Sequence, residues 1–117
     1  PTQAITKPYV VDGSKCISYA TIELDPDLDI PDELQTNMDN WIFGCDICQD
    51  VCPWNRFAKP SEVQAFLPIE DLRMGGVPDF GGMDVEKFAE IFGQSPLGRP
   101  GLKGLKRNQS VRHLSTK

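Results

Sequence analysis

Four cysteines are the residues of this 117-residue chain whose type and spacing could bind a metal centre. Cys45, Cys48 and Cys52 lie within eight residues, in the stretch GCDICQDVCPWN, and Cys16 lies well before them. A disulfide scaffold of this length would need more cysteines, spread along the chain. The crowded thiolates instead favour a metal or iron-sulfur centre in a reducing compartment.

The spacing of these cysteines matches an incomplete ferredoxin run. A bacterial run reads C-x2-C-x2-C-x3-C-P, and its fourth cysteine ligates the other cluster in two-cluster proteins. Cys45, Cys48 and Cys52 fill the last three positions, whereas Ile42 stands at the first. We therefore expect Cys16 to replace the first ligand beside Cys45 and Cys48 on one 4Fe-4S cluster, and Cys52 to bind the other.

The cluster that Cys16 joins still needs a fourth ligand. The crossover rule assigns this ligand to the last cysteine of a companion run, which ends in C-P. The chain opens with Pro1, and Ala4 follows three positions later, as a C-P-x-x-A ending cut after its cysteine would leave it. We expect the missing cysteine directly before Pro1, in a larger protein of which this chain is a piece.

Two other uses of the same cysteines stay open. The first is a stand-alone two-cluster ferredoxin-type module for electron transfer, whose acidic body would dock to a reductase. The second is a four-cysteine zinc site in a nucleic-acid-binding module. Zinc pairs usually come as two short C-x2-C hairpins, and the three-residue gap between Cys48 and Cys52 fits this pattern poorly.

The charges of the chain are divided unequally. Seventeen acidic and six basic residues precede Arg99, so residues 1–98 carry a net charge of −11, and residues 99–117 carry +6. The basic residues of this tail are Arg99, Lys103, Lys106, Arg107, Arg112 and Lys117. Such a tail is a candidate contact for a polyanion.

Short helices and turns must position the cysteines. Tyr9, Val10 and Val11 favour a strand. Asp12 or Ser14 can cap a helix that runs to Leu24 and holds Cys16 in its first turn. A second short helix is expected near Pro31, and residues 45–51 are expected to form a helical turn that Pro53 stops.

The clearest helical pattern covers residues 85–92. Asp84 is its expected cap, Phe88 and Phe92 share one face, and Gly93 ends it. From Pro100 onward the leucines and basic residues predict an interrupted basic helix.

These elements predict an α+β, mostly helical fold, with short helices and long loops followed by a basic helical tail. We expect a partial ferredoxin-like domain for 4Fe-4S clusters over residues 1–60 and a helical extension with the basic tail over 61–117. No run of eighteen apolar residues occurs, so a membrane span is not expected, and we expect a soluble monomer.

Four stretches of the sequence together match a known family: PYVVDGSKCISYATIEL, IFGCDICQDVCPWNRFA, an FLP segment and KGLKRN. The resemblance is to the epoxyqueuosine reductases, cobalamin- and iron-sulfur-dependent enzymes of queuosine synthesis in tRNA. It implies a C-terminal fragment of a cytoplasmic oxidoreductase that removes the epoxide oxygen reductively to give queuosine. The fragment, which lacks the cobalamin-binding domain, is expected to be inactive by itself.

The resemblance also implies cofactors and partners. It assigns Cys16, Cys45, Cys48 and Cys52 to two 4Fe-4S clusters that pass electrons to cobalamin, and it implies a flavodoxin or ferredoxin as electron donor. Ser18 and the backbone of Asp46 and Ile47 are its candidates for contact with cobalamin. Its candidates for phosphate contacts with tRNA carrying epoxyqueuosine are Lys103, Lys106, Arg107 and Asn108.

Overall fold

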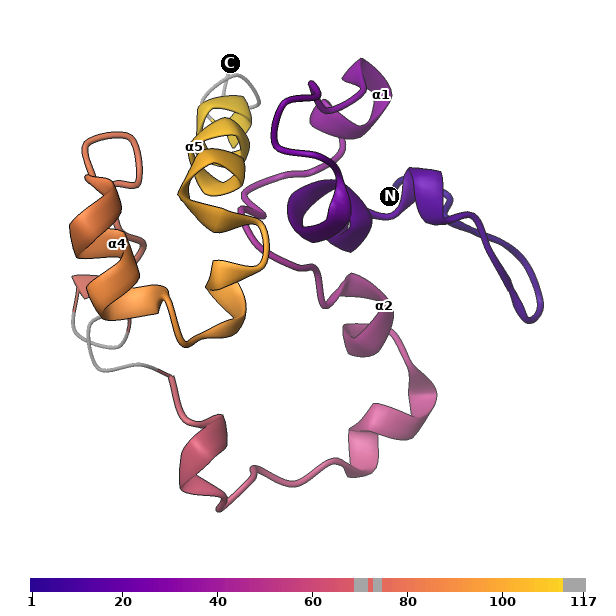
Figure 1. Ribbon diagram of the computed structural model, residues 1–117. Helices are drawn as coiled ribbons and strands as arrows, with labels where there is room; N and C mark the ends of the chain where they lie inside the picture. Colours follow the sequence, from indigo (N-terminus) through magenta and orange to yellow (C-terminus); the bar gives the residue numbers. More distant parts are fainter. Residues whose placement is uncertain (69–71, 73–74, 113–117) are drawn as a thin grey trace. The chain divides into compact units, whose positions relative to one another are not determined.

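The structure, a computed structural model, describes residues 1–68, 72 and 75–112 (Figure 1). The chain divides into two compact units: residues 1–45 with the described residues from Phe80 onward form the first, and residues 46–79 form the second. The last helix packs against the segment that follows Cys16, so both ends of the chain contribute to the first unit. The predicted domain boundary at residue 60 stays a prediction. The mostly helical character is confirmed, with one two-stranded sheet among the described residues.

A small hairpin begins the first unit. Strand β1 (Ile5–Lys7) pairs antiparallel with β2 (Val10–Val11), and the register is irregular between Ile5 and Lys7. Tyr9 turns the chain between the strands with a φ of 64°. The strand predicted at Val10 and Val11 is confirmed, and β-branched residues at these exposed positions suit the extended backbone.

Two helical pieces flank Cys16. The 3-10 turn η1 (Gly13–Lys15) is capped by Asp12, whose carboxylate accepts hydrogen bonds from the Ser14 amide at 3.1 Å and the Ser14 hydroxyl at 2.6 Å. The hydroxyl bond is the main cause that lowers the pKa of Asp12. This cap is therefore kept at neutral pH and lost as the pH falls through the lowered pKa.

Cys16 itself has an extended conformation, with a φ of −84° and a ψ of 126°. Helical geometry resumes at Ile17 and continues as the π-type helix η2 (Tyr19–Glu23). The expectation that Cys16 lies in the first turn of one continuous helix is therefore wrong. The break lets Ile17 and Ala20 enter the core while the Cys16 side chain stays half-buried.

Helix α1 (Asp32–Gln35) is a single turn that follows Pro31 directly, as the proline position predicted. Short helices in the described part of the second unit include α2 (Ile47–Asp50), η3 (Pro53–Phe57) and η4 (Gln64–Phe66). The helical turn predicted over residues 45–51 is confirmed by α2.

Helix α4 (Val85–Phe92) agrees closely with its prediction. The Asp84 carboxylate accepts a 2.7 Å hydrogen bond from the Lys87 amide, and Gly93 is the C-terminal cap. The ring of Phe92 lies 5.7 Å from that of Phe88 and 6.0 Å from that of Phe80, centroid to centroid. These rings anchor the helix in the core of the first unit.

The last helix, α5 (Gly101–Arg112), follows the 3-10 turn η5 (Pro96–Gly98). It is continuous over its twelve residues, so the predicted interruption does not occur between Gly101 and Arg112. Lys117 lies outside the described residues. Gly101 begins α5 with a φ of 66°, and a Cβ at Gly104 would lie 3.0 Å from Pro100 Cβ, which shows how closely the chain approaches this face.

The core of the first unit is formed by side chains from η2, α1, α4 and α5 and from the segments next to these helices. Its members are Ile17, Ala20, Ile30, Leu34, Met38, Ile42, Phe80, Phe88, Phe92, Leu102, Leu105 and Val111. Two polar side chains, Thr21 and Asn108, are completely buried among them. Within the described part of the chain, no helix has the length and apolar character needed to cross a bilayer.

The cap of α4 provides a test of this fold. Asp84→Ala should lower the free energy of unfolding by about 1 kcal/mol, because the Lys87 amide loses its acceptor. Urea denaturation of the chain measures this change. The matched control is Glu90→Ala, at an exposed position of the same helix; equal effects of the two substitutions would contradict the assigned cap.

Candidate metal centre

The structure places the cysteines in both units. Cys16 and Cys45 belong to the first unit, and Cys48 and Cys52 belong to the second. None of the four forms a disulfide; Cys48 is exposed and the other three are half-buried. Among the described residues, which include every cysteine, no group of three or more His, Cys, Asp or Glu residues is arranged to hold a metal ion.

Local hydrogen bonds fix the two cysteines of the second unit relative to each other. Cys48 lies on α2, and Cys52 is the N-cap of η3. The Cys52 amide donates to the Gln49 carbonyl at 3.1 Å. The Asn55 side-chain amide donates to that same carbonyl at 2.7 Å, so the turn after Cys52 is tied to the helix that carries Cys48.

One buried hydroxyl joins the segments that carry Cys16 and Cys45. The Thr21 hydroxyl donates to the carbonyl of Ile17, the residue after Cys16, at 2.9 Å. It accepts a 3.0 Å hydrogen bond from the amide of Gly44, the residue before Cys45. The two cysteines, far apart in sequence, are thus connected through a single side chain. Gly44 has a φ of 69°, a conformation that favours glycine.

The carboxamide of Asn108 makes a second connection between the same segments. Its nitrogen donates to the carbonyls of Thr21 and Ile42, each at 2.8 Å. Its oxygen accepts from Arg107 Nε at 3.1 Å and Nη2 at 3.0 Å. All the hydrogen-bonding capacity of this buried group is therefore used, as burial requires.

Arg107 is directed inward as well. Its guanidinium donates to backbone carbonyl oxygens of η2 and the segment after it: Ala20 at 2.8 Å, Leu24 at 3.4 Å, Asp25 at 2.7 Å and Leu28 at 2.9 Å. Burial lowers the pKa of Arg107, and the charges of Asp25 and Asp29 act in the opposite direction. Arginine remains charged under such shifts, so the guanidinium holds this loop as a cation.

The four residues predicted to contact phosphate therefore differ in burial and in hydrogen-bond partners. Asn108 has no exposed surface, and Arg107 is occupied by backbone carbonyls, so neither is available to a phosphate in this conformation. Lys103 is exposed and forms an ion pair with Asp27. Lys106 is half-buried.

Other tail residues also contact the body of the first unit. Arg99 lies 2.8 Å from the Glu23 carboxylate, and Arg112 donates to the Asn40 side chain at 3.2 Å. The tail's positive charges are therefore partly neutralised by acidic residues that lie far earlier in the chain.

The predicted cobalamin contacts fall on both units. Ser18 is half-buried at the N-cap of η2 in the first unit, and its side chain makes no capping hydrogen bond. Asp46 is exposed at the N-cap of α2, and Ile47 is the half-buried first residue of that helix.

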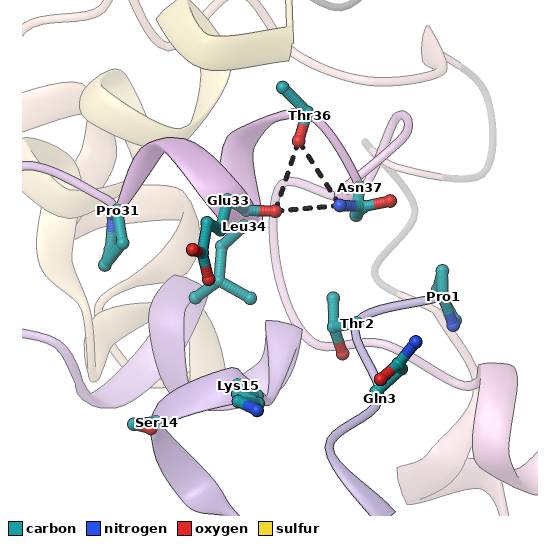
Figure 2. Close-up of a pocket in the computed structure, with 10 residues that line it drawn as sticks. All are labelled: Pro1, Thr2, Gln3, Ser14, Lys15, Pro31, Glu33, Leu34, Thr36 and Asn37. Carbon is teal, nitrogen blue, oxygen red and sulfur yellow. Dashed lines mark hydrogen bonds between the residues drawn. The ribbon is translucent and has the colours of Figure 1, made fainter.

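A cavity of about 500 Å³ lies beside the turn that leads to Cys16 (Figure 2). Its walls come from residues 1–3, from Ser14 and Lys15, and from residues of and around α1. On one wall the Asn37 side-chain amide donates to the Glu33 carbonyl at 2.8 Å. The cysteines are not among its lining residues, and nothing in the sequence pattern predicted this cavity.

Residues 1–55 match the family described as "4Fe-4S double cluster binding domain". The matched segment contains all four cysteines. The class of protein indicated by the cysteines and this match is therefore one with a domain for two iron-sulfur clusters.

Comparison with individual proteins shows which enzymes this chain is similar to. An epoxyqueuosine reductase of Leadbetterella byssophila is 55% identical over 108 residues, which are 92% of this chain and 34% of that protein. The epoxyqueuosine reductase of Escherichia coli is 40% identical over 111 residues, which are 95% of this chain and 29% of that protein. The crystal structure of an epoxyqueuosine reductase with an epoxyqueuosine-modified tRNA stem loop has a TM-score of 0.83 and 27% identity, over 98% of this chain and 30% of that one.

The chain is therefore a relative of part of the epoxyqueuosine reductases, and the resemblance drawn from its sequence is confirmed. It spans about a third of the length of these curated relatives. The relatives are oxidoreductases by name, which confirms the enzyme family expected from the sequence.

Thr21 was not predicted to have a role, and Asn108 was predicted to have a different one. A signal for Thr21 was present, because a threonine inside a helix can return its hydroxyl to the carbonyl four residues earlier. No comparable signal exists for Asn108, since its partners come from segments 66 and 87 residues away.

The contribution of the inward-directed Arg107 to stability can be tested by comparing its substitution with that of Lys106. Arg107→Ala should lower the free energy of unfolding by about 2 kcal/mol or more, because several carbonyls lose a charged donor. Lys106→Ala, the matched control, should change it by less than about 0.5 kcal/mol. Urea denaturation of the chain measures both variants, and a smaller loss for Arg107→Ala than for Lys106→Ala would contradict the assignment.

Proposed function

We propose that this chain is a segment of an epoxyqueuosine reductase that holds ligands of two 4Fe-4S clusters and delivers electrons to the reaction centre. The observation that carries the proposal is the match of residues 1–55, with all four cysteines, to the double-cluster family within a chain 40–55% identical to reductases of that name. The reaction of the whole protein would convert epoxyqueuosine to queuosine in tRNA. The segment by itself would be inactive.

The donor set fits iron-sulfur clusters. None of the four cysteines forms a disulfide, and thiolate sulfur is the ligand that such clusters prefer. We assign Cys16, Cys45 and Cys48 to one cluster and Cys52 to the other. The remaining ligands would come from cysteines outside this chain. When bound, the clusters would supply one-electron transfer.

Cobalamin would be the acceptor of these electrons in the whole protein and would supply the reductive chemistry that removes the epoxide oxygen. Ser18 and Asp46 offer polar groups that can hydrogen-bond the amide-bearing edge of a corrin. The Ser18 side chain caps no helix, and Asp46 is exposed. With Ile47, they are the residues of this chain that we propose to lie against the cofactor.

The proposed substrate is tRNA that carries epoxyqueuosine, supported by the relative whose structure contains such a modified stem loop. Lys103 and Lys106 are the residues of the predicted set that we retain for phosphate contact. A flavodoxin or ferredoxin would supply electrons, and the protein would act as a monomer in the cytoplasm. The ferredoxin-like arrangement of the cluster domain over residues 1–60 is part of this proposal.

Anaerobic reconstitution with iron and sulfide tests the cofactor. The full-length protein should become brown and contain about eight iron atoms, as two 4Fe-4S clusters require. Iron analysis and the visible absorption spectrum measure this result. A colourless protein that binds zinc at the same cysteines would contradict the proposal and favour the zinc-binding alternative.

The ligand assignment is tested by two single substitutions in the full-length protein. Cys16→Ala should impair one cluster and Cys52→Ala the other, because a 4Fe-4S cluster that loses a thiolate becomes labile. Electron paramagnetic resonance of the reduced protein distinguishes the two clusters. Loss of the same cluster in both variants would refute the crossed arrangement.

The phosphate contacts are tested by salt dependence. Lys103→Ala combined with Lys106→Ala should weaken tRNA binding and reduce the slope of log K against log salt by roughly one for each phosphate that a lysine no longer neutralises. The control is Lys87→Ala, at an exposed position of α4. A slope equal to that of the control would remove both lysines from the tRNA surface.

A further inference from the structure

The two buried polar side chains of the first unit connect the same pair of segments. Thr21 and Asn108 have no exposed surface, and each bonds the backbone on both sides of the gap between Cys16 and Cys45. Among the described residues, no buried side-chain nitrogen or oxygen lacks a partner. A core that needed only apolar packing would have no use for this network, since a buried polar group gains little net stability from its hydrogen bonds.

The path from one cysteine to the other is short. The Cys16 carbonyl accepts from the Ala20 amide at 3.1 Å, which fixes Cys16 at the start of its helical segment. The Thr21 hydroxyl donates to the Ile17 carbonyl and accepts from the Gly44 amide at 3.0 Å. Cys45 is the residue after Gly44. Each step is a hydrogen bond or a peptide link, so Thr21 ties together the two segments that carry Cys16 and Cys45.

Asn108 supports the same link from α5. Its nitrogen bonds the Thr21 carbonyl and the Ile42 carbonyl at equal distances of 2.8 Å. Arg107 holds the Asn108 oxygen and thereby fixes which end of the carboxamide faces the carbonyls. A helix distant in sequence from both cysteines therefore limits the movement of the two segments.

We infer that Thr21 and Asn108 are positioning residues for the cluster that Cys16 and Cys45 share, an inference that rests on the proposed function. They act through the backbone of the two ligand segments, to which they are hydrogen-bonded. Their role is to keep two ligand segments at a fixed separation, so that loss of either link loosens this cluster selectively. The cluster that Cys52 joins should not respond.

The test compares Thr21→Val with Thr21→Ser in the reconstituted full-length protein. Valine keeps the shape and removes the hydroxyl, whereas serine keeps the hydroxyl. In Thr21→Val, chelator-driven release of iron from the Cys16 cluster should be about tenfold faster, the effect of roughly 1.4 kcal/mol from a lost buried hydrogen bond. Thr21→Ser should restore release to within about twofold of the unmodified protein. Asn108→Leu should resemble Thr21→Val.

A purely structural role is excluded by a matched control. Phe92→Leu reduces the packing of α4 in the core and lowers stability, but Phe92 bonds neither cysteine segment. The inference is supported if Thr21→Val labilises one cluster and Phe92→Leu does not at equal loss of melting temperature. It is overturned if both substitutions labilise the two clusters equally.

A second readout does not depend on the clusters. In cluster-free full-length protein, the Gly44 amide should exchange with solvent about tenfold faster in Thr21→Val, because it loses its acceptor. Unchanged exchange would overturn the inference. Absence of iron-sulfur signals from the unmodified protein would contradict the proposed function instead. The exchange rate of the Gly44 amide would then still show whether Thr21 links the two segments.

Discussion

The carboxamide of Asn108 is the contact on which the arrangement of the first unit depends. Its two N–H groups bond carbonyls of segments that the sequence keeps far apart, and its oxygen is held by the neighbouring Arg107. A buried amide that lost any of these partners would cost about 1–3 kcal/mol. Because the bonds are directional, they select one placement of α5 against the helix after Cys16, as apolar contacts alone would not.

The same arrangement brings basic residues of α5 and its preceding turn next to acidic residues from early in the chain. The basic helix α5 and its preceding turn lie against the acidic segment 23–29, where Arg99 pairs with Glu23 and Lys103 pairs with Asp27. Both pairs are exposed, so each stabilises the fold little. They do reduce the net positive charge that α5 can offer to a polyanion.

Part of this structure could be predicted from the sequence because the relevant signals are local. Helix α4 carries its own cap at Asp84, its apolar face and its terminating glycine, and all three were identified. The spacing of Cys45, Cys48 and Cys52 is also local, whereas the assignment of Cys16 to their cluster joins distant positions of the chain and stays a prediction. The break at Cys16 was not predicted. The cap at Asp12 and the helical pattern around Ile17 were both identified, but nothing in the sequence showed that the backbone is extended at Cys16, between them.

The inward roles of Arg107 and Asn108 could not be read from the sequence. In the stretch KGLKRN both residues have the polar side chains expected of a solvated basic surface. Only their tertiary hydrogen-bond partners distinguish them from exposed residues. Those partners are backbone carbonyls, which every segment has, so no residue type in the sequence indicates them. Thr21 differs, because its bond to Ile17 is local and only its bond to Gly44 required the fold.

We propose above that Cys16, Cys45 and Cys48 bind one cluster while Cys52 binds the other. A crystal structure of the full-length protein, reconstituted with iron and measured at the iron absorption edge, tests this claim most directly. We expect two separate iron positions, with the sulfurs of Cys16, Cys45 and Cys48 at the first and that of Cys52 at the second. Cys52 on the same cluster as Cys45, or all four cysteines around one zinc ion, would contradict it.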